Sequence, residues 1–214
     1  MPAAPLFPMF LKLEGRPCLA VGAGRIGEPK IRSLVECGAK VFVVAPVAEE
    51  SIAEAARKGE IVWSRKSFEP ADLDGIFLVV AATSSAEVNH AIYHEAKRRG
   101  ILCNVVDDPS HCDFFYPAVV RRGNFQIAIS TGGLSPALAQ RVRKDLEKEF
   151  SSLYEDWLEQ LGRTRAALFE QVSDPGLRRD LIHESVTSEA FAKFARNRHS
   201  PETPPAPETG KESL

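Results

Sequence analysis

The sequence lacks the features typical of membrane, secreted, nucleic-acid-binding and disordered proteins. No apolar run approaches the roughly 20 residues that a membrane-spanning helix requires, and the N-terminus has neither the basic segment nor the long apolar stretch of a signal peptide. A formal net charge of −2 at pH 7 offers no basic field to nucleic acid and no acidic excess typical of disorder. We therefore expect a cytoplasmic globular protein that binds neither a membrane nor nucleic acid.

Cysteine is scarce, and its spacing contains no metal or redox motif. The four cysteines include no C-x-x-C pair, and three of them lie in or beside apolar runs. They are Cys18, Cys37, Cys103 and Cys112. We expect them to be reduced, buried thiols.

The first half of the chain alternates between strand and helix patterns. Short apolar runs predict strands at 17–22, 41–46, 61–68, 75–83 and 101–108. Amphipathic stretches between them predict helices, three of which end at Gly38, Gly59 and Gly100. This alternation predicts an α/β fold with a Rossmann-type parallel sheet and right-handed crossovers.

The pattern changes after residue 113. Two apolar segments, 114–120 and 124–130, are joined by R-R-G-N, which predicts an antiparallel hairpin. Apolar residues at steps of three and four then predict one long amphipathic helix, with Ser135 as its N-cap and Gly162 at its end. Shorter helical patterns continue to about Arg196 with a turn at 173–176, and the Pro-, Glu-, Thr- and Ser-rich end is typical of disorder.

One glycine motif indicates a ligand-binding turn. Residues 22–27 read G-A-G-R-I-G, which matches G-x-G-x-x-G and stands between a predicted strand and a predicted helix. In a dinucleotide site Gly22 permits a sharp turn, Gly24 lets a pyrophosphate approach the backbone, and Gly27 lets helix and strand pack closely. The N–H groups of the turn, including those of Arg25 and Ile26, then face the phosphates. The alternative is a tight turn without a ligand.

The acidic residue that usually binds the ribose of NAD is missing from the expected place. Pro46 closes the second predicted strand, and Ala45, Pro46 and Val47 stand where Asp or Glu is typical. No arginine stands there either, so a 2′-phosphate has no evident partner. We expect NAD rather than NADP, with backbone groups of 45–47 at the ribose.

Several segments resemble the precorrin-2 dehydrogenase/sirohydrochlorin ferrochelatase family, the N-terminal dehydrogenase part of siroheme synthase. The similarity begins with P-L-F at 5–7, continues through the glycine turn to Lys30 and V-F-V-V-A-P at 41–46, and includes A-A-T at 81–83 with Asn89. The more specific blocks are C-N-V-V-D-D-P at 103–109 and the segment 114–147 with its S-T-G-G-L-S-P. Ala23 and Gly27 depart from the family's usual glycine and alanine.

The resemblance implies a homodimer that oxidises precorrin-2 to sirohydrochlorin, with hydride passing to NAD⁺. Some relatives also insert Fe²⁺, and Fe²⁺ or Co²⁺ is then a further substrate. It further implies four parts of the chain. These are an NAD-binding Rossmann domain at 1–114, a dimerisation segment at 115–150, a small helical domain at 151–197 and a disordered tail at 198–214.

Asp107 is the catalytic residue that the resemblance implies. It ends a predicted parallel strand, at the edge where open α/β sheets bind ligands, and its carboxylate could accept a pyrrole proton or steer a cation. A turn or capping aspartate is the alternative, and Asp108 is the weaker candidate. Thr83 joins the cofactor-binding set through the A-A-T match.

The substrate's eight carboxylates predict a lining of donors and basic groups. Thr131, Gly132 and Gly133 lead into a predicted helix N-terminus that suits a carboxylate. Thr131 also stands where a relative carries a phosphorylated serine. Arg141 is the basic residue we assign to substrate binding, whereas solvated surface is the alternative for it and its neighbours. Those neighbours are Arg121, Arg122, Arg143 and Lys144.

No metal-ligating set is assigned. His90 and His94 lie one helical turn apart, a spacing that can bind a metal, but no third ligand is evident beside them and we expect both to be exposed. His111 and Cys112 could assist an incoming Fe²⁺, although loop residues without a role are the simpler interpretation. Two other functions stay open: a different NAD-dependent oxidoreductase and a non-catalytic NAD(H)-sensing dimer.

Overall fold

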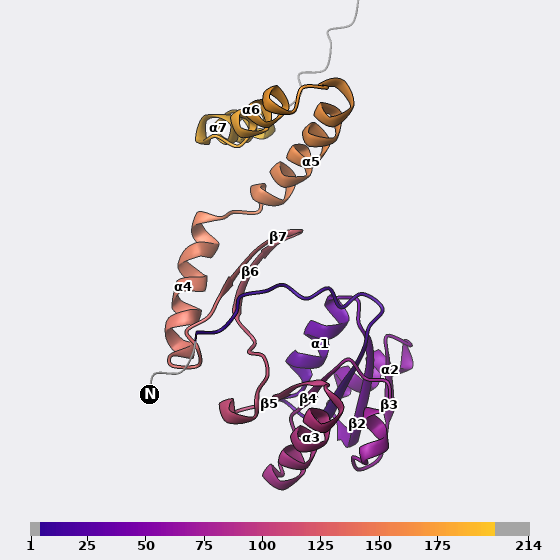
Figure 1. Cartoon of the computed structure of the whole chain (residues 1–214). Helices are drawn as coiled ribbons and strands as arrows, with labels where there is room; N and C mark the ends of the chain where they lie inside the picture. The colour runs from indigo at the N-terminus through magenta and orange to yellow at the C-terminus, as the bar shows by residue number, and fades with distance from the viewer. Residues whose placement is uncertain (1–4, 200–214) are drawn as a thin grey trace, which may run out of the picture. The chain divides into compact units, whose positions relative to one another are not determined.

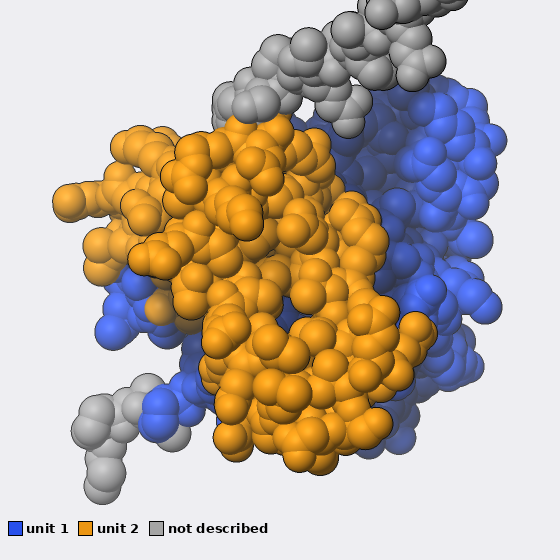
Figure 2. Space-filling model, turned by 90° about the horizontal axis from the view of Figure 1, so that it is seen from above, with its two compact units in different colours: residues 1–116, 131–135 blue, residues 117–130, 136–214 orange. Residues whose placement is uncertain are grey.

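The computed structural model describes residues 5–199, which fall into two compact units. Unit 1 is the described part of Met1–Tyr116 together with Thr131–Ser135, and unit 2 is Pro117–Ser130 together with the described part of Pro136–Leu214 (Figure 2). The predicted tail over 198–214 lies outside the described residues except for its first two, which end a helix. In the described part of the chain, no helix combines the length and apolarity needed to cross a membrane.

Unit 1 contains a five-stranded parallel sheet in the order β3-β2-β1-β4-β5 (Figure 1). The strands are β1 Pro17–Ala23, β2 Lys40–Ala48, β3 Ile61–Ser64, β4 Leu78–Ala81 and β5 Leu102–Val105. The helices between them are α1 Glu28–Glu36, α2 Glu50–Arg57 and α3 Ala86–Arg99, with 3₁₀ turns η1 Pro70–Leu73 and η2 Pro109–His111. The predicted Rossmann-type parallel sheet is confirmed.

Helices cover both faces of the sheet, which explains why its strands are mainly apolar. Ala20 of β1 belongs to a core shared with Ile31 of α1 and residues of α2. Val21, one residue along, points to the opposite core with Ile92 of α3 and residues of η1. Because successive strand residues alternate between faces, β1, β2, β4 and β5 supply apolar side chains to both cores, whereas the edge strand β3 contributes only to the core that contains Ala20.

Strand β2 runs two residues beyond its predicted end at Pro46. The ladder pairs Val21 with Val44 and then Ala23 with Ala48, so residues 45–47 form a bulge opposite Gly22. Proline has no N–H to donate, and a bulge is one of the few places where a strand tolerates it. The prediction that the proline closes the strand is therefore wrong.

Unit 2 consists of a hairpin followed by helices. The hairpin is β6 Ala118–Arg122 with β7 Phe125–Ile129, and its antiparallel pairing confirms the prediction. The helices are α4 Pro136–Glu149, α5 Leu153–Gln171, α6 Pro175–Ser185 and α7 Ser188–His199. Helix α4 begins at Pro136, as the S-P pair indicates.

The prediction of one continuous helix from Ser135 to Gly162 is wrong. Helix α4 ends at Glu149 and α5 begins at Leu153. The side chain of Arg122 explains the break, because its Nε donates to the carbonyl of Phe150 at 2.9 Å and its Nη2 to the carbonyl of Glu147 at 3.1 Å. The guanidinium thus satisfies carbonyls at the end of α4 that a continuing helix would have bonded to its own N–H groups.

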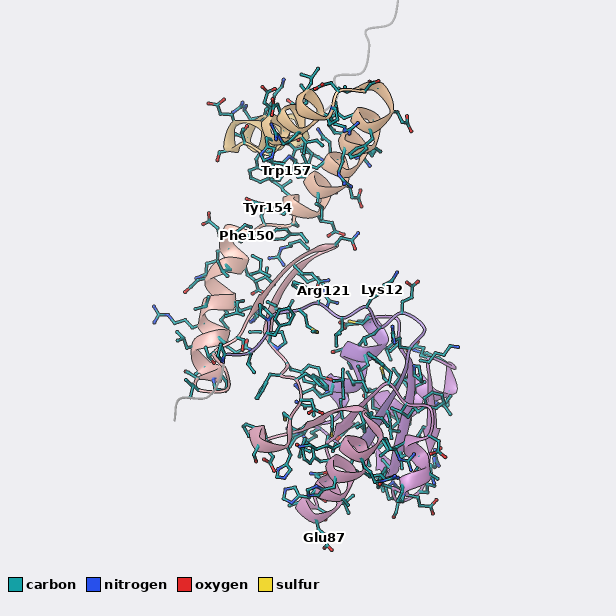
Figure 3. All side chains as sticks on the ribbon, viewed as in Figure 1. Lys12, Glu87, Arg121, Phe150, Tyr154 and Trp157 are labelled. Atoms are coloured by element: carbon teal, nitrogen blue, oxygen red, sulfur yellow. The ribbon has the colours of Figure 1, made fainter. Side chains whose placement is uncertain are left out.

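Aromatic packing holds the junction of α4 and α5. The rings of Phe150, Tyr154 and Trp157 follow one another along the junction (Figure 3). Phe125 of β7 and Phe191 of α7 join them, with centroid separations in the cluster of 4.7 to 5.7 Å. Residues of the apolar pattern that predicted one helix therefore pack into the core of unit 2 on both sides of the break.

Gly162 lies inside α5 and is exposed, with nothing within 4 Å of a built Cβ. We expect Gly162→Ala to stabilise unit 2 by about 1 kcal/mol, because glycine is that much poorer than alanine in a helix interior. Chemical denaturation followed by Trp157 fluorescence in a Trp63→Phe background measures it. A loss of stability would show that residue 162 needs a conformation only glycine adopts, as a helix end would.

Candidate active site

The chain leaves the sheet in opposite directions after two neighbouring strands. After β1 it continues into α1, which packs on one face, and after β4 it continues into α3 on the other. In open parallel sheets this divergence leaves a crevice at the carboxyl ends of the two strands, where ligands bind. The glycine turn at 22–27 lies at this point.

Two glycines of the turn have no room for a side chain. Gly22 has φ of +95°, and a Cβ built on it would lie within 3.0 Å of the carbonyl oxygen of Ala82. A Cβ on Gly27 would lie within 3.0 Å of the carbonyl oxygen of Gly22. The turn, the loop after β4 and the start of α1 are therefore packed backbone against backbone.

The third glycine faces open space. Nothing lies within 4 Å of a Cβ built on Gly24. Among the described residues, no group accepts a hydrogen bond from the N–H groups of Arg25, Ile26 or Gly27, which precede α1. A bare backbone with unpaired N–H groups before a helix is the arrangement that binds a pyrophosphate. These residues therefore fit the phosphates of a dinucleotide.

The loop after β4 is held rigidly beside the turn. Asn89 of α3 is buried, and its Oδ1 accepts hydrogen bonds from the backbone N–H of Thr83 at 3.2 Å and from its hydroxyl at 2.7 Å. The amide Nδ2 of Asn89 donates to the carbonyl of Thr83 at 3.1 Å. The Thr83 hydroxyl is thus occupied within the loop. Its predicted contact with the cofactor stays a prediction.

The bulge at 45–47 lies on the other side of the turn. Ala45 is buried and its carbonyl accepts a hydrogen bond from Trp63 Nε1 at 2.9 Å, whereas Pro46 and Val47 are exposed. Because β2 extends to Ala48, the first acidic residue after it is Glu49, whose N–H donates to the carbonyl of Ala23 at 2.9 Å. An acidic residue therefore does follow β2 beside the turn, two positions beyond the expected place at 45–47.

Asp107 follows β5 at the same edge of the sheet. It is the only described non-glycine residue with positive φ, at 63°, and it is exposed. A non-glycine residue in the left-handed region costs of order 1–3 kcal/mol when it is strained, less for Asp and Asn, and such residues cluster at functional sites. The carboxylate is thus presented to solvent beyond the strand end.

Lys30 connects the glycine turn to Asp107 electrostatically. Its ammonium lies 4.0 Å from the ring centroid of Tyr116, which is a cation–π contact. Burial lowers the pKa of Lys30, and the nearby carboxylate of Asp107 acts in the opposite direction. The lysine of the family motif therefore lies near Asp107, at the carboxyl edge of the sheet.

The predicted substrate-binding residues belong to different units. Thr131, Gly132 and Gly133 are part of unit 1, and a Cβ on Gly133 would contact the ring of Phe115 at 3.8 Å. Arg141 lies exposed on α4 in unit 2, 3.9 Å from Asp145. Their role toward a substrate stays a prediction. Arg122 has a structural task instead, since it caps α4.

His90 does not stand alone, contrary to our expectation. Its Nε2 lies 3.0 Å from Oδ2 of Asp108, and Nδ1 of His111 lies 2.7 Å from the same oxygen. Hydrogen bonds from Ser110 above all, and from the two imidazoles, hold the pKa of Asp108 well below its usual range. His94 is exposed, as predicted.

Sequence reasoning missed this cluster because its members come from two elements. Eighteen residues separate His90 on α3 from Asp108 beside η2, so no motif spacing joins them. Cys112 lies in the same loop, and its Sγ is within hydrogen-bond distance of the carbonyls of Val105 at 3.1 Å and Asp108 at 3.2 Å, so the single thiol proton can be shared between them.

Comparison with known proteins agrees with this geometry. Residues 9–118 match a family described as putative NAD(P)-binding, and residues 122–149 match one described as sirohaem biosynthesis protein central. A solved structure described as SirC, precorrin-2 dehydrogenase is similar with a TM-score of 0.76 and 28% identity, covering 90% of this chain and 98% of that one. The resemblance found from sequence motifs is thereby confirmed.

The curated relatives are longer proteins. Siroheme synthase 1 of Aeromonas salmonicida is 44% identical over 140 residues, which is 65% of this chain and 30% of the relative. Siroheme synthase of Photorhabdus laumondii is 35% identical over 190 residues, which is 89% of this chain and 40% of the relative. The chain thus spans 30% and 40% of the lengths of these two relatives.

The open space at Gly24 gives a direct test of the phosphate site. We expect Gly24→Ala to raise the Kd for NAD⁺ at least about tenfold, ~1.4 kcal/mol, because a Cβ would occupy the place of a phosphate. Thermal stability should stay unchanged, since nothing in the protein meets that Cβ. Isothermal titration with NAD⁺ measures the change, and Gly162→Ala is the matched control. Unaltered affinity would place the nucleotide elsewhere.

Proposed function

The chain belongs to the family described as putative NAD(P)-binding, and from this premise we propose that it oxidises precorrin-2 to sirohydrochlorin with NAD⁺ as the hydride acceptor. The proposal rests on two features at the carboxyl edge of the parallel sheet. There the glycine turn after β1 offers unpaired N–H groups, and Asp107 after β5 offers an exposed carboxylate. The precorrin-2 dehydrogenase structure, which is similar over 90% of the chain, supplies the substrate class.

The chemistry divides between the cofactor and the chain. When bound, the nicotinamide accepts the hydride that leaves the tetrapyrrole. Oxidation removes a proton as well, and Asp107 is the group that we assign to take it from a pyrrole nitrogen. Its fixed left-handed backbone sets the direction of the carboxylate before substrate arrives. Lys30 lies close enough to Asp107 for the two charges to interact.

We assign carboxylate binding to the segment before α4 and to Arg141. The tetrapyrrole carries eight carboxylates. Thr131, Gly132 and Gly133 precede a helix, where backbone N–H groups favour anions. Arg141 lies exposed on that helix, 3.9 Å from Asp145, and a guanidinium suits a carboxylate.

Glu49 is our basis for NAD rather than NADP. The family match establishes a nicotinamide dinucleotide without choosing between the two. The backbone of Glu49 lies at the glycine turn, because its N–H donates a hydrogen bond to the carbonyl of Ala23. The residue is half-buried. A carboxylate there accepts a hydrogen bond from a ribose 2′-hydroxyl and repels a 2′-phosphate. Residues 45–47 remain the backbone part of this ribose site.

Three further expectations stay predictions. They are the homodimer, the insertion of Fe²⁺ or Co²⁺ into sirohydrochlorin, and phosphorylation of Thr131. Size-exclusion chromatography with light scattering tests the first. Sirohydrochlorin absorbance after adding Co²⁺, corrected for the uncatalysed rate, tests the second.

The oxidation itself is tested with NADH fluorescence. Purified protein with NAD⁺ and precorrin-2 should generate NADH and the absorbance of sirohydrochlorin at equal rates. If NAD⁺ binds but neither product forms, the chain is an NAD(H)-sensing module or acts on another substrate. Screening other reduced substrates for NADH formation then separates these two alternatives.

Asp107→Asn tests the proposed base. Asparagine tolerates the left-handed backbone, so we expect the fold and NAD⁺ binding to survive. Turnover should fall at least about 100-fold, the usual contribution of a general acid or base. Asp74→Asn, which removes an exposed carboxylate before β4 at the opposite edge, is the charge-matched control. Unchanged turnover in Asp107→Asn would remove this residue from the mechanism.

Glu49→Gln tests cofactor choice. We expect the ratio of NADP⁺ to NAD⁺ affinity to rise about tenfold, because the amide no longer repels a 2′-phosphate. Glu50→Gln is the matched control, since Glu50 is exposed and its carboxylate pairs with Arg57 at 2.6 Å. The same ratio in both variants would show that selectivity lies outside Glu49.

A further inference from the structure

Three potential metal ligands meet beside η2, in unit 1. One oxygen, Oδ2 of Asp108, lies 3.0 Å from His90 Nε2 and 2.7 Å from His111 Nδ1. The three ligand atoms all lie within 4.8 Å of one another. One carboxylate oxygen is therefore close to a nitrogen of each imidazole.

The two imidazoles are oriented as a pair. Their rings stack with centroids 4.3 Å apart and an interplanar angle of 24°. Tyr93 packs its edge against His111, with centroids 4.7 Å apart. Because ring packing sets both orientations, two nitrogens already face one carboxylate, and little side-chain entropy remains to be lost on binding an ion.

A hydrogen bond to the carboxylate's other oxygen completes the arrangement. Ser110 Oγ donates to Oδ1 of Asp108 at 2.5 Å, which leaves Oδ2 for the imidazoles. Outer partners of this kind orient the ligands of metal sites. In the structure as it stands, each facing imidazole nitrogen donates a proton to the ionised carboxylate. An ion would take the lone pairs of those nitrogens, with each proton moving to the other ring nitrogen.

The spacing suits a transition metal after a small expansion. Ligand atoms about 2.1 Å from a metal at tetrahedral angles lie roughly 3.4 Å apart. The two contacts to Oδ2 are 0.4 to 0.7 Å shorter than that. Side chains that keep 43%, 26% and 24% of their surface exposed, for His90, Asp108 and His111 respectively, can open by this amount.

We propose that His90, Asp108 and His111 form a binding site for a divalent transition-metal ion, with water at the remaining coordination positions. Two imidazoles and one carboxylate suit ions such as Zn²⁺, Co²⁺ or Fe²⁺ rather than Mg²⁺ or Ca²⁺, which prefer oxygen ligands. The partial exposure of all three side chains gives the ion access from solvent.

The ion would cross-link two elements of unit 1. His90 belongs to α3 and His111 to η2, so coordination ties the helix to the loop that follows β5. Asp107 immediately precedes Asp108 and is no part of the ligand set. The site is therefore separate from the carboxylate proposed for catalysis, although it lies in the same loop.

Co²⁺ is the probe, because its visible absorption reports coordination by nitrogen and oxygen. Titrating the full chain with Co²⁺ should give one saturable set of bands, displaced by Zn²⁺, and should raise the thermal unfolding midpoint. We expect His90→Gln and His111→Gln each to weaken binding at least about 100-fold, since even losing an outer partner of a ligand costs 10- to 100-fold. Both variants should lose the thermal stabilisation.

His94→Gln is the matched control, since His94 lies exposed on the same helix one turn away. It should retain the bands and the stabilisation. Circular dichroism establishes that each variant is folded. Absence of saturable Co²⁺ binding, or its survival in both His90→Gln and His111→Gln, would overturn the proposal. Because the readout is metal binding in the absence of NAD⁺, a negative result would not contradict the proposed oxidation of precorrin-2.

Discussion

The close approach of three backbone segments at the switch point of the sheet determines the rest of unit 1. Gly22 lies against the carbonyl of Ala82, and Gly27 lies against the carbonyl of Gly22, with no room for a side chain at either glycine. Only this packing lets α1 start directly beyond β1. The N–H groups of Arg25, Ile26 and Gly27, which precede the helix, are thereby left unpaired among the described residues at the carboxyl edge of the sheet. The dinucleotide site therefore depends on glycine at positions 22 and 27, where a Cβ would not fit.

Local signals in the sequence sufficed for the sheet and the glycine turn, because both depend on residues near one another in the chain. The break between α4 and α5 could not be predicted in this way. Periodicity continues across it, and the cause is Arg122, a hairpin residue that bonds to the carbonyl of Phe150 from 28 positions away. The bulge that absorbs Pro46 likewise depends on pairing with β1.

The candidate site likewise combines residues found from local motifs with residues that only the folded chain brings together. Asp107 and the glycines were found from motifs. The role proposed for Glu49 depends on where β2 ends, and Pro46 led to a predicted end that is too early. The histidine cluster needed α3 and η2 to be placed together, and no spacing rule contains that information. The left-handed backbone of Asp107 was also invisible, because aspartate, unlike glycine, gives no compositional sign of positive φ.

The chain passes between the two units three times, at 116–117, 130–131 and 135–136. A single cut therefore cannot release either unit intact. Truncation after Tyr116 would deprive the nucleotide-binding half of Thr131–Ser135, including two glycines that we assign to substrate. Anyone wishing to transplant this nucleotide-binding half into another scaffold must keep the β6–β7 hairpin or rejoin the short return segment Thr131–Ser135 through a designed linker.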